Sequence, residues 1–247
     1  MRRNRLLAVK GAALLAAALA GIAADSAFAA AGAVTHLSGA VVARRGDGQS
    51  QILSVKSEVK EGDVIATADN SYARVKFGDG TEVVLRPNTQ IKVEAFKFEE
   101  QKPREDNVLL SLLKGGLRSV TGLLAKRNPE NFRVQSPTAT IGIRGTNFGA
   151  LFCQNDCAGV PGGGGGGQPP ANGLHVDVSD GAIIVSNAGG SREFKVGEFG
   201  FVQSSQSPPV QVPAGQATPV ALPQQAANQQ ILGGTVGTSS SLECTIK

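Results

Sequence analysis

Ser136–Ala150 reads Ser-Pro-Thr-Ala-Thr-Ile-Gly-Ile-Arg-Gly-Thr-Asn-Phe-Gly-Ala and combines strand-forming residues, glycine and a single charge. The β-branched threonines and isoleucines favour an extended backbone, and Pro137 keeps the residue before it out of the helical region. Gly142 and Gly145 stand on either side of Arg144, which predicts a bulge, a bend or a close backbone approach beside the arginine. The stretch therefore predicts a strand that is interrupted near Arg144.

The chain before this stretch alternates between short strands and tight turns. In Tyr72–Phe77, apolar and charged side chains alternate with the period of two that is typical of a half-buried strand. Two turn sequences place an aspartate beside glycine, which suits the positive φ angles of hairpin turns: Gly62-Asp63 and Gly78-Asp79-Gly80. A calcium site at these aspartates would need a denser acidic loop. We expect an antiparallel meander of strands over 58–67, 72–77, 81–85 and 90–95.

The next segments are less regular. The leucines of Val108–Leu113 suit a buried strand or a helical turn, and the Lys114-Gly115-Gly116 sequence after them favours strand, turn, strand. A charged loop is expected over 97–107, and a second loop, held by Pro129, over 125–131.

An insertion follows Phe152. It covers about 153–173 and contains Cys153, Cys157 and a run of six glycines. This composition cannot bury a core and predicts a flexible hairpin excursion from the sheet. A Cys153–Cys157 disulfide would close the base of this loop, and the alternative pairs Cys244 with one of the two.

An internal echo indicates the architecture. Ser38-Gly39-Ala40-Val41-Val42 resembles Asp180-Gly181-Ala182-Ile183-Ile184, and the sequence from Gly116 to Val120 is a weaker third copy. Such repeats favour similar strands in the same layer. With no tryptophan and one tyrosine, we expect a core of valine, isoleucine, leucine and alanine. The fold class is all-β: an antiparallel rolled sheet, or a β-sandwich or β-solenoid-like domain, with short hairpins.

The first 29 residues have the pattern of a secretory signal peptide. A basic start leads into the apolar run 11–24, and Ala27-Phe28-Ala29 fits a cleavage site. The run is shorter than the roughly 20 residues that span a bilayer, which argues against the alternative of a retained anchor. These residues hold four of the 24 basic residues and one of the 20 acidic ones, so the net charge falls from +4 to about +1 after cleavage. Binding to nucleic acid would need a basic stripe, which is absent.

The expected organisation is a signal peptide over 1–29, a β domain over 30–203 and a low-complexity, disordered tail over 204–247, rich in Pro, Gln, Ser and Ala.

Several motifs occur in the order of a known family. They are a Gly-Ala-Val-Val strand, Glu-Gly-Asp-Val-Ile-Ala-Thr-Ala, Tyr-Ala-Arg-Val-Lys-Phe-Gly-Asp-Gly-Thr-Glu-Val-Val-Leu-Arg-Pro-Asn-Thr, a Gly-Gly-Leu-Arg strand, and the opening stretch. Over Val34–Val202 the sequence resembles the FecR-type domain of bacterial periplasmic and envelope proteins, and Arg144-Gly145-Thr146 is its most distinctive element. The resemblance implies an all-β periplasmic domain used for sensing or protein contact. The sigma-factor-binding segment and membrane helix of the signalling branch do not precede it here.

Arg144 has two interpretations. It could recognise a partner, or its planar fork of donors could tie strand ends or a turn carboxylate such as Asp79 or Asp63. We favour the second interpretation, which predicts that Arg144→Lys lowers thermal stability.

The sequence gives little support for an enzyme. The two histidines, His36 and His175, lie beside no nucleophilic pattern, and the glycine run lacks the lysine and helix of a phosphate loop. A metal site from Cys153, Cys157, Cys244 and His175 is the only candidate, and we expect no cofactor. We predict an exported binding or sensing module that contacts another envelope or periplasmic protein. The alternative is a structural or assembly factor at the cell surface.

Overall fold

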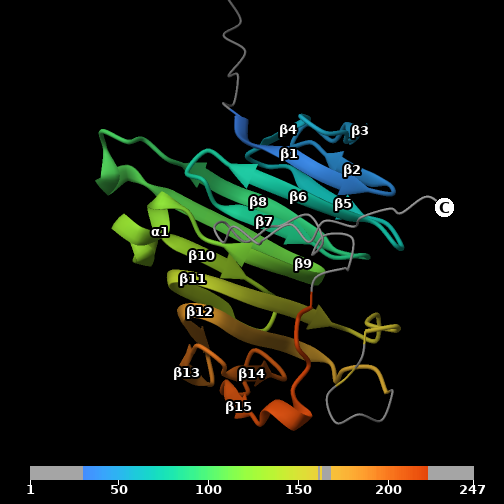
Figure 1. Cartoon of the computed structure of the whole chain (residues 1–247), viewed down its shortest axis with the longest axis vertical. Helices are drawn as coiled ribbons and strands as arrows, with labels where there is room; N and C mark the ends of the chain where they lie inside the picture. Colours follow the sequence, from blue (N-terminus) through green and yellow to red (C-terminus); the bar gives the residue numbers. More distant parts are fainter. Residues whose placement is uncertain (1–29, 161, 163–167, 222–247) are drawn as a thin grey trace, which may run out of the picture.

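The computed structural model of the chain describes residues 30–160, 162 and 168–221, and strands make up most of it (Figure 1). The expected signal peptide and Cys244 lie outside the described residues. The elements are β1 (Ala30–Ser38), β2 (Val41–Arg44), β3 (Ser50–Ile52), β4 (Glu58–Lys60), β5 (Val64–Thr67), β6 (Tyr72–Phe77), β7 (Glu82–Leu85), β8 (Gln90–Lys97), η1 (Pro103–Glu105), β9 (Asn107–Val120), α1 (Leu123–Arg127), η2 (Pro129–Asn131), β10 (Phe132–Gln135), β11 (Thr140–Cys153), β12 (Gly173–Asn187), β13 (Gly190–Lys195), β14 (Phe199–Val202), β15 (Val210–Val212) and η3 (Ala214–Gln216).

The strands form one mixed sheet that does not close on itself. Its pairings follow two series. The first runs β4-β1-β6-β7 and continues through the second half of β9, the second half of β11 and the first half of β12 to β14 and β15. The other runs β3-β2-β5-β8 through the first halves of β9 and β11, with β10 between them, to the second half of β12 and β13. The expected rolled sheet is confirmed, with one parallel pairing, between β9 and β10.

The two series enclose a single hydrophobic core. Buried side chains from both belong to one cluster, for example Val75 of β6 and Ile65 of β5. The core is aliphatic in most places, as expected, but four phenylalanines are also among its largest fully buried side chains: Phe132, Phe148, Phe152 and Phe194. The long strands β9, β11 and β12 belong to both series, so they fix how the two layers face one another.

A glycine with a positive φ angle stands at four of the places where the chain passes from one series to the other. These are Gly39 between β1 and β2 (φ 74°), Gly115 in β9 (φ 74°), Gly145 in β11 (φ 57°) and Gly181 in β12 (φ 71°). The internal echo in the sequence is explained by this geometry, because two of its copies centre on Gly39 and Gly181. In the third copy the bend is at Gly115, one residue before the glycine that we aligned.

A hydroxyl from a neighbouring segment satisfies the backbone next to three of these bends. Thr89 Oγ1 accepts a hydrogen bond from the N–H of Gly116 and donates to its carbonyl, both at 2.9 Å. Beside Gly39, the Ser71 hydroxyl accepts a hydrogen bond from the N–H of Ala40. Beside Gly145, the Thr121 hydroxyl accepts from the N–H of Thr146 and donates to its carbonyl oxygen. Buried backbone groups need such partners wherever a ladder is interrupted.

Two expectations about strand order are wrong. The predicted meander is not formed, because β7 and β8 do not pair with each other and each pairs with a different half of β9. The predicted strand, turn, strand over residues 108–120 is one strand, since Gly115 bends β9 and does not reverse it. In the segment expected to be a loop around Pro129, Leu123–Arg127 is a short helix that buries Leu124.

The expected disordered tail is also corrected over its first part. Residues 204–221 are described, β15 pairs with β14, and Val220 is fully buried. The rest of the tail, from residue 222, lies outside the described residues. In the part of the chain that the structure describes, we find no helix with the length and apolar character needed to span a bilayer.

We predict that Gly115→Ala destabilises the protein by about 2–4 kcal/mol, because the residue combines a positive φ with close backbone contact. A Cβ atom there would lie 2.6 Å from the Asn88 carbonyl oxygen. Gly142→Ala is the control, since its nearest contact would be 3.8 Å away and its φ is not positive. Urea unfolding of the two variants measures the difference, and equal midpoints would contradict the role of the bend.

Candidate functional site

Arg144-Gly145-Thr146 forms the irregular point of β11. The pairing register with β12 shifts between Arg144 and Asn147, so the interruption predicted from the sequence is confirmed. Thr146 is buried, and its N–H donates to Thr121 Oγ1 at 2.8 Å. On the facing strand, a Cβ atom at Gly181 would lie 2.3 Å from the Gly145 carbonyl oxygen. The two bends are therefore packed against each other.

The Arg144 side chain does not have the role that we favoured from the sequence. It is exposed, and it makes no hydrogen bond or ion pair with any of the described residues. The two carboxylates expected to bind it have other partners: Arg45 binds Asp63, and Thr81 binds Asp79. Arg144 instead lines an open hollow between β11 and the α1–η2 segment.

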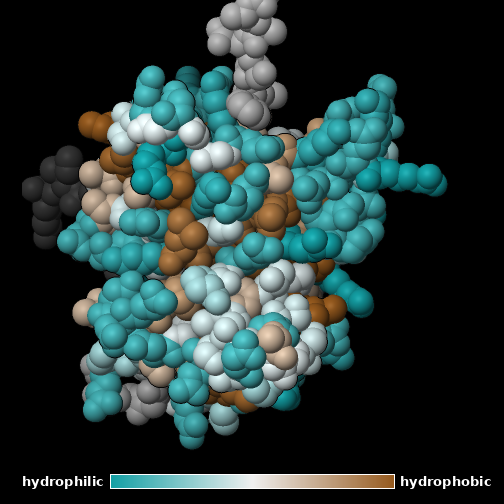
Figure 2. Space-filling model, turned by 180° about the vertical axis from the view of Figure 1, so that it is seen from behind, coloured by the Kyte–Doolittle hydropathy of each residue, from teal (hydrophilic) through white to brown (hydrophobic). Residues whose placement is uncertain are grey.

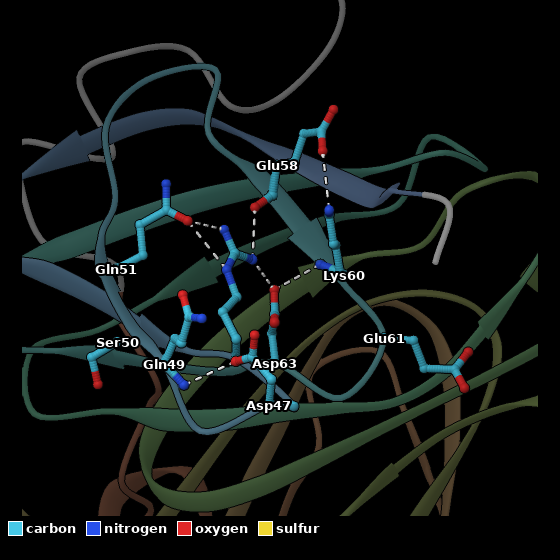
Figure 3. A pocket seen from close by; sticks show the side chains of 10 residues that line it. Asp47, Gln49, Ser50, Gln51, Glu58, Lys60, Glu61 and Asp63 are labelled. Atoms are coloured by element: carbon cyan, nitrogen blue, oxygen red, sulfur yellow. Dashed lines mark hydrogen bonds and ion pairs between the residues drawn. The ribbon is translucent and has the colours of Figure 1, made fainter. Parts of the chain in front are cut away.

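An open hollow of about 760 Å³ lies between the β2–β3 hairpin and the turn from β4 to β5 (Figure 3). Its floor is the ion pair of Arg45 with Asp63, whose side chain is only 2% exposed. Arg45 also donates to the Glu58 carbonyl oxygen at 3.2 Å and to the Gln51 side chain. Asp63 accepts the N–H of Lys60 at 2.8 Å. This network links β3 and β4 to the residues that directly follow β2 and precede β5.

The rim of the hollow is acidic. Four carboxylates and two basic groups line it, which gives the hollow a net charge of about −2: Asp47, Glu58, Glu61 and Asp63 against Arg45 and Lys60. Glu58 and Lys60 form an exposed ion pair at 3.8 Å, and Asp47 accepts the Gln49 N–H at 2.9 Å. No cluster of metal-ligating side chains is found here or elsewhere in the described ranges.

The second turn sequence, Gly78-Asp79-Gly80, is also held by hydrogen bonds within the fold. Gly80 has a φ of 85°, and the buried Asp79 accepts both the N–H and the hydroxyl of Thr81, at 3.0 and 2.8 Å. The Asp79 carbonyl oxygen accepts the N–H of Leu123, which anchors the start of α1. Gly78 lies against the Phe96 ring.

The predicted Cys153–Cys157 disulfide is confirmed. It stands at the end of β11, where Cys153 pairs with Gly173, so the glycine-rich insertion connects the two strands of a hairpin. The structure does not bring His175 into a metal site. Its Nε2 lies 2.8 Å from the Ala171 carbonyl oxygen, and burial lowers the pKa of the imidazole below its ordinary value, a change that this hydrogen bond partly opposes.

Part of this chain is similar to a known protein family. A sequence model of the FecR protein family matches residues 63–158. This part of the chain is similar to a FecR-type domain. The matched residues run from Asp63 to the disulfide loop and include both the Asp79 turn and the Arg144-Gly145-Thr146 bend. They exclude β1–β4 and β12–β15, although these strands complete the same sheet.

Solved structures give more distant similarities. Two, each titled a "putative anti-sigma factor" from Parabacteroides distasonis, are 16% identical, with TM-scores of 0.44 and 0.46. They cover 62% and 69% of this chain, and the chain spans 60% and 64% of theirs. A third, titled "Cell surface anchoring domain", is 26% identical over 26% of this chain and 84% of its own, with a TM-score of 0.25. No curated protein matches.

Sequence reasoning missed a second polar cluster on the FecR-type sheet. Arg118 of β9 forms a largely buried ion pair with Asp177 of β12 and donates to Asn147 and Ser179 at 3.1 and 2.8 Å. The available signal was local. Asp177 is a charge between two valines, and a charge at such a position needs a partner when it is buried.

We predict that Arg45→Ala lowers the free energy of unfolding by about 2–3 kcal/mol, because it leaves the buried Asp63 carboxylate without its counter-charge. Arg144→Ala should change it by less than about 0.5 kcal/mol, as for an exposed side chain. Chemical denaturation of both variants beside the native chain provides the comparison. A large loss for Arg144→Ala would restore the structural role that we assigned to it from the sequence.

Proposed function

We propose that the chain is an exported, non-enzymatic FecR-domain protein that binds or senses another protein of the cell envelope. The observation that carries this proposal is the combination of an acidic hollow and an unpaired sheet edge at one end of the molecule. Strand β3 pairs with β2 on one side and has no strand partner on its other side among the described residues. Its residues Ser50 and Gln51 also line the hollow.

The unpaired edge carries exposed apolar side chains. Ile52, at the end of β3, is 80% exposed, and Val55 in the following turn is 51% exposed. Edge strands of soluble proteins are usually protected by charges or covered, because they can pair with another chain. An exposed isoleucine beside such an edge therefore favours a protein that adds a strand or packs an apolar side chain here.

Seen from behind, the molecule is hydrophilic over most of its outline, with apolar side chains gathered in the middle of the upper half (Figure 2). The net negative charge of the hollow selects a partner with basic groups next to an apolar side chain, because complementary charges speed encounter and fix orientation. A basic, partly apolar protein segment is thus the partner that this end fits.

Export to the periplasm or beyond is supported by the Cys153–Cys157 disulfide, because disulfides persist mainly in oxidising compartments. We propose a mature protein with one β domain that starts at residue 30 and includes the ordered part of the tail.

Export predicts a mature protein whose first residue is Ala30. Intact-mass measurement and N-terminal sequencing of the chain recovered from the periplasm of a bacterial host should both give this residue. Replacing Ala27 and Ala29 with bulky residues should retain the uncleaved chain at the membrane, since signal peptidase requires small residues there. A wild-type chain that keeps residues 1–29 at the membrane would support the retained anchor instead.

Partner binding predicts that Ile52→Ser combined with Val55→Ser weakens retention of a periplasmic protein by at least about tenfold, or 1.4 kcal/mol. The immobilised mature chain is exposed to periplasmic extract, and the retained protein is identified and its affinity measured. Val196→Ser is the control, because Val196 is 59% exposed and follows β13 at the other end of its series. If binding is lost in the control and kept in the double variant, the partner does not bind at Ile52 and Val55. Retention of an envelope polymer, with no discrete protein, would favour the assembly role.

A further inference from the structure

The last described segment of the chain lies on the sheet like a bound peptide. Val220 is fully buried although it is 18 residues beyond the end of β14. Its Cβ atom occupies the space that a side chain at Gly149 would fill, because a Cβ at Gly149 would lie 2.5 Å from it. The missing side chain at this position of β11 therefore lets residue 220 lie directly on the strand.

The Arg118–Asp177 pair binds both backbone groups of that one residue. The N–H of Val220 donates to Asp177 Oδ2 at 2.8 Å. Its carbonyl oxygen accepts from Arg118 Nε and Nη2 at 3.3 and 3.1 Å. Two charged side chains thus replace the backbone groups of a neighbouring strand. Such contacts recognise an extended peptide whatever its side chains are, and the charges strengthen them.

An apolar pocket receives the valine side chain. Val220 packs with Leu151 and the Cys153–Cys157 disulfide in a cluster separate from the main core, with Val160 beside it. This pocket has room for a β-branched side chain, which gives the site selectivity at one position. We name Arg118, Asp177, Gly149 and this pocket the tail groove.

Among residues 217–221, hydrogen bonds to the sheet involve Val220 alone, although Ala217 and Thr218 are also buried. Among the described residues, the backbone bonds of Ala217–Pro219 consist of one local turn, from the Ala217 N–H to Ala214. Segments with so few backbone bonds open locally at low free energy compared with core strands. The tail groove can therefore become vacant without unfolding the sheet.

The tail groove also has a cationic group that its occupant does not use. The guanidinium of Arg86 is close enough to Asp177 and Arg118 for their charges to affect it, and burial lowers its pKa from the ordinary value. Its Nη1 is buried and has no hydrogen-bond partner in the described part of the chain. The Arg86, Arg118 and Asp177 side chains together carry a net charge of about +1, and residues 217–221 carry no charge. A carboxylate on the occupant would fill this gap.

We propose that the tail groove is a docking site for an extended acidic peptide segment of a partner protein, and that residues 217–221 occupy it in competition. The partner segment places a β-branched apolar residue in the pocket of Val220 and a neighbouring carboxylate near Arg86. The site is separate from the acidic hollow beside β3, which selects basic groups, and the inference holds whether or not that end binds a partner.

The test uses two fluorescent peptides and the full mature chain. The neutral probe copies residues 215–221, and the acidic probe has glutamate in place of Pro219 and Ala221. Val220→Asp removes the competing residue from its apolar pocket, so this variant should bind either probe at least about tenfold more tightly than the native chain, whose groove is occupied. The acidic probe should bind more tightly than the neutral one, and Arg86→Gln in the same variant should remove that preference.

Further variants distinguish binding at the tail groove from binding at the acidic hollow beside β3. Adding Ile52→Ser to the Val220→Asp chain should leave probe binding unchanged, and adding Arg118→Gln should abolish it. No binding of either probe by the folded Val220→Asp chain would overturn the proposal, as would an acidic preference that survives Arg86→Gln. If Val220→Asp does not fold, hydrogen exchange in the native chain decides. The Val220 amide should exchange at least about a hundredfold faster than that of Phe148, and equal protection would overturn the competition.

Discussion

The two-layered sheet depends on bends at which a strand leaves one layer and continues in the other. An L-residue rarely adopts the backbone angles that such a bend requires, and at Gly115 and Gly181 a side chain would also collide with neighbouring backbone. Each bend interrupts a ladder of hydrogen bonds, and a threonine or serine from the next segment replaces what is lost at three of them. Glycine and hydroxyl together make the crossing possible at these three bends and give the adjacent buried backbone groups hydrogen-bond partners.

This constraint explains what the most distinctive motif of the FecR-type domain does. Gly145 provides the bend in β11, and Thr146 carries the backbone groups that Thr121 binds. Arg144, the arginine of the motif, is exposed at the surface between the bulge in β11 and the helix α1. The arginines that hold the molecule together, Arg45 and Arg118, are instead paired with buried aspartates far away in the sequence. A conspicuous residue in a motif can thus owe its position to its neighbours' backbone geometry.

Local patterns in the sequence were sufficient for much of this fold. Alternation identified strands such as β6, aspartate beside glycine identified the turns, and a spacing of four residues identified the disulfide. Pairing between distant strands was not readable, because the pattern of β7 and β8 is the same whether they pair with each other or with β9. Side-chain partners were equally hidden: nothing near Asp63 in the sequence points to Arg45 in place of Arg144.

The tail shows a related limit. Its composition lacks the apolar content of a core segment, which is why it was expected to be disordered. Residues Ala217, Thr218 and Val220 are nevertheless buried, and a charged pair on the sheet binds both backbone groups of Val220. Individual contacts of this kind do not appear in any average over residue types. Together with the acidic hollow, this gives the protein two surfaces of opposite charge at different places on one sheet.

The order of the strands in the sheet has a consequence for how the chain reaches its native state. Strands β7 and β8 each need the later strand β9 as their second neighbour in the sheet. In the same way β9 needs β10 and β11, and β11 needs β12. During folding, each intermediate sheet thus ends in an open edge that waits for residues further along the chain. Such edges can pair with other molecules. A protein built in this order gains from staying unfolded and shielded by chaperones until its last strands are available.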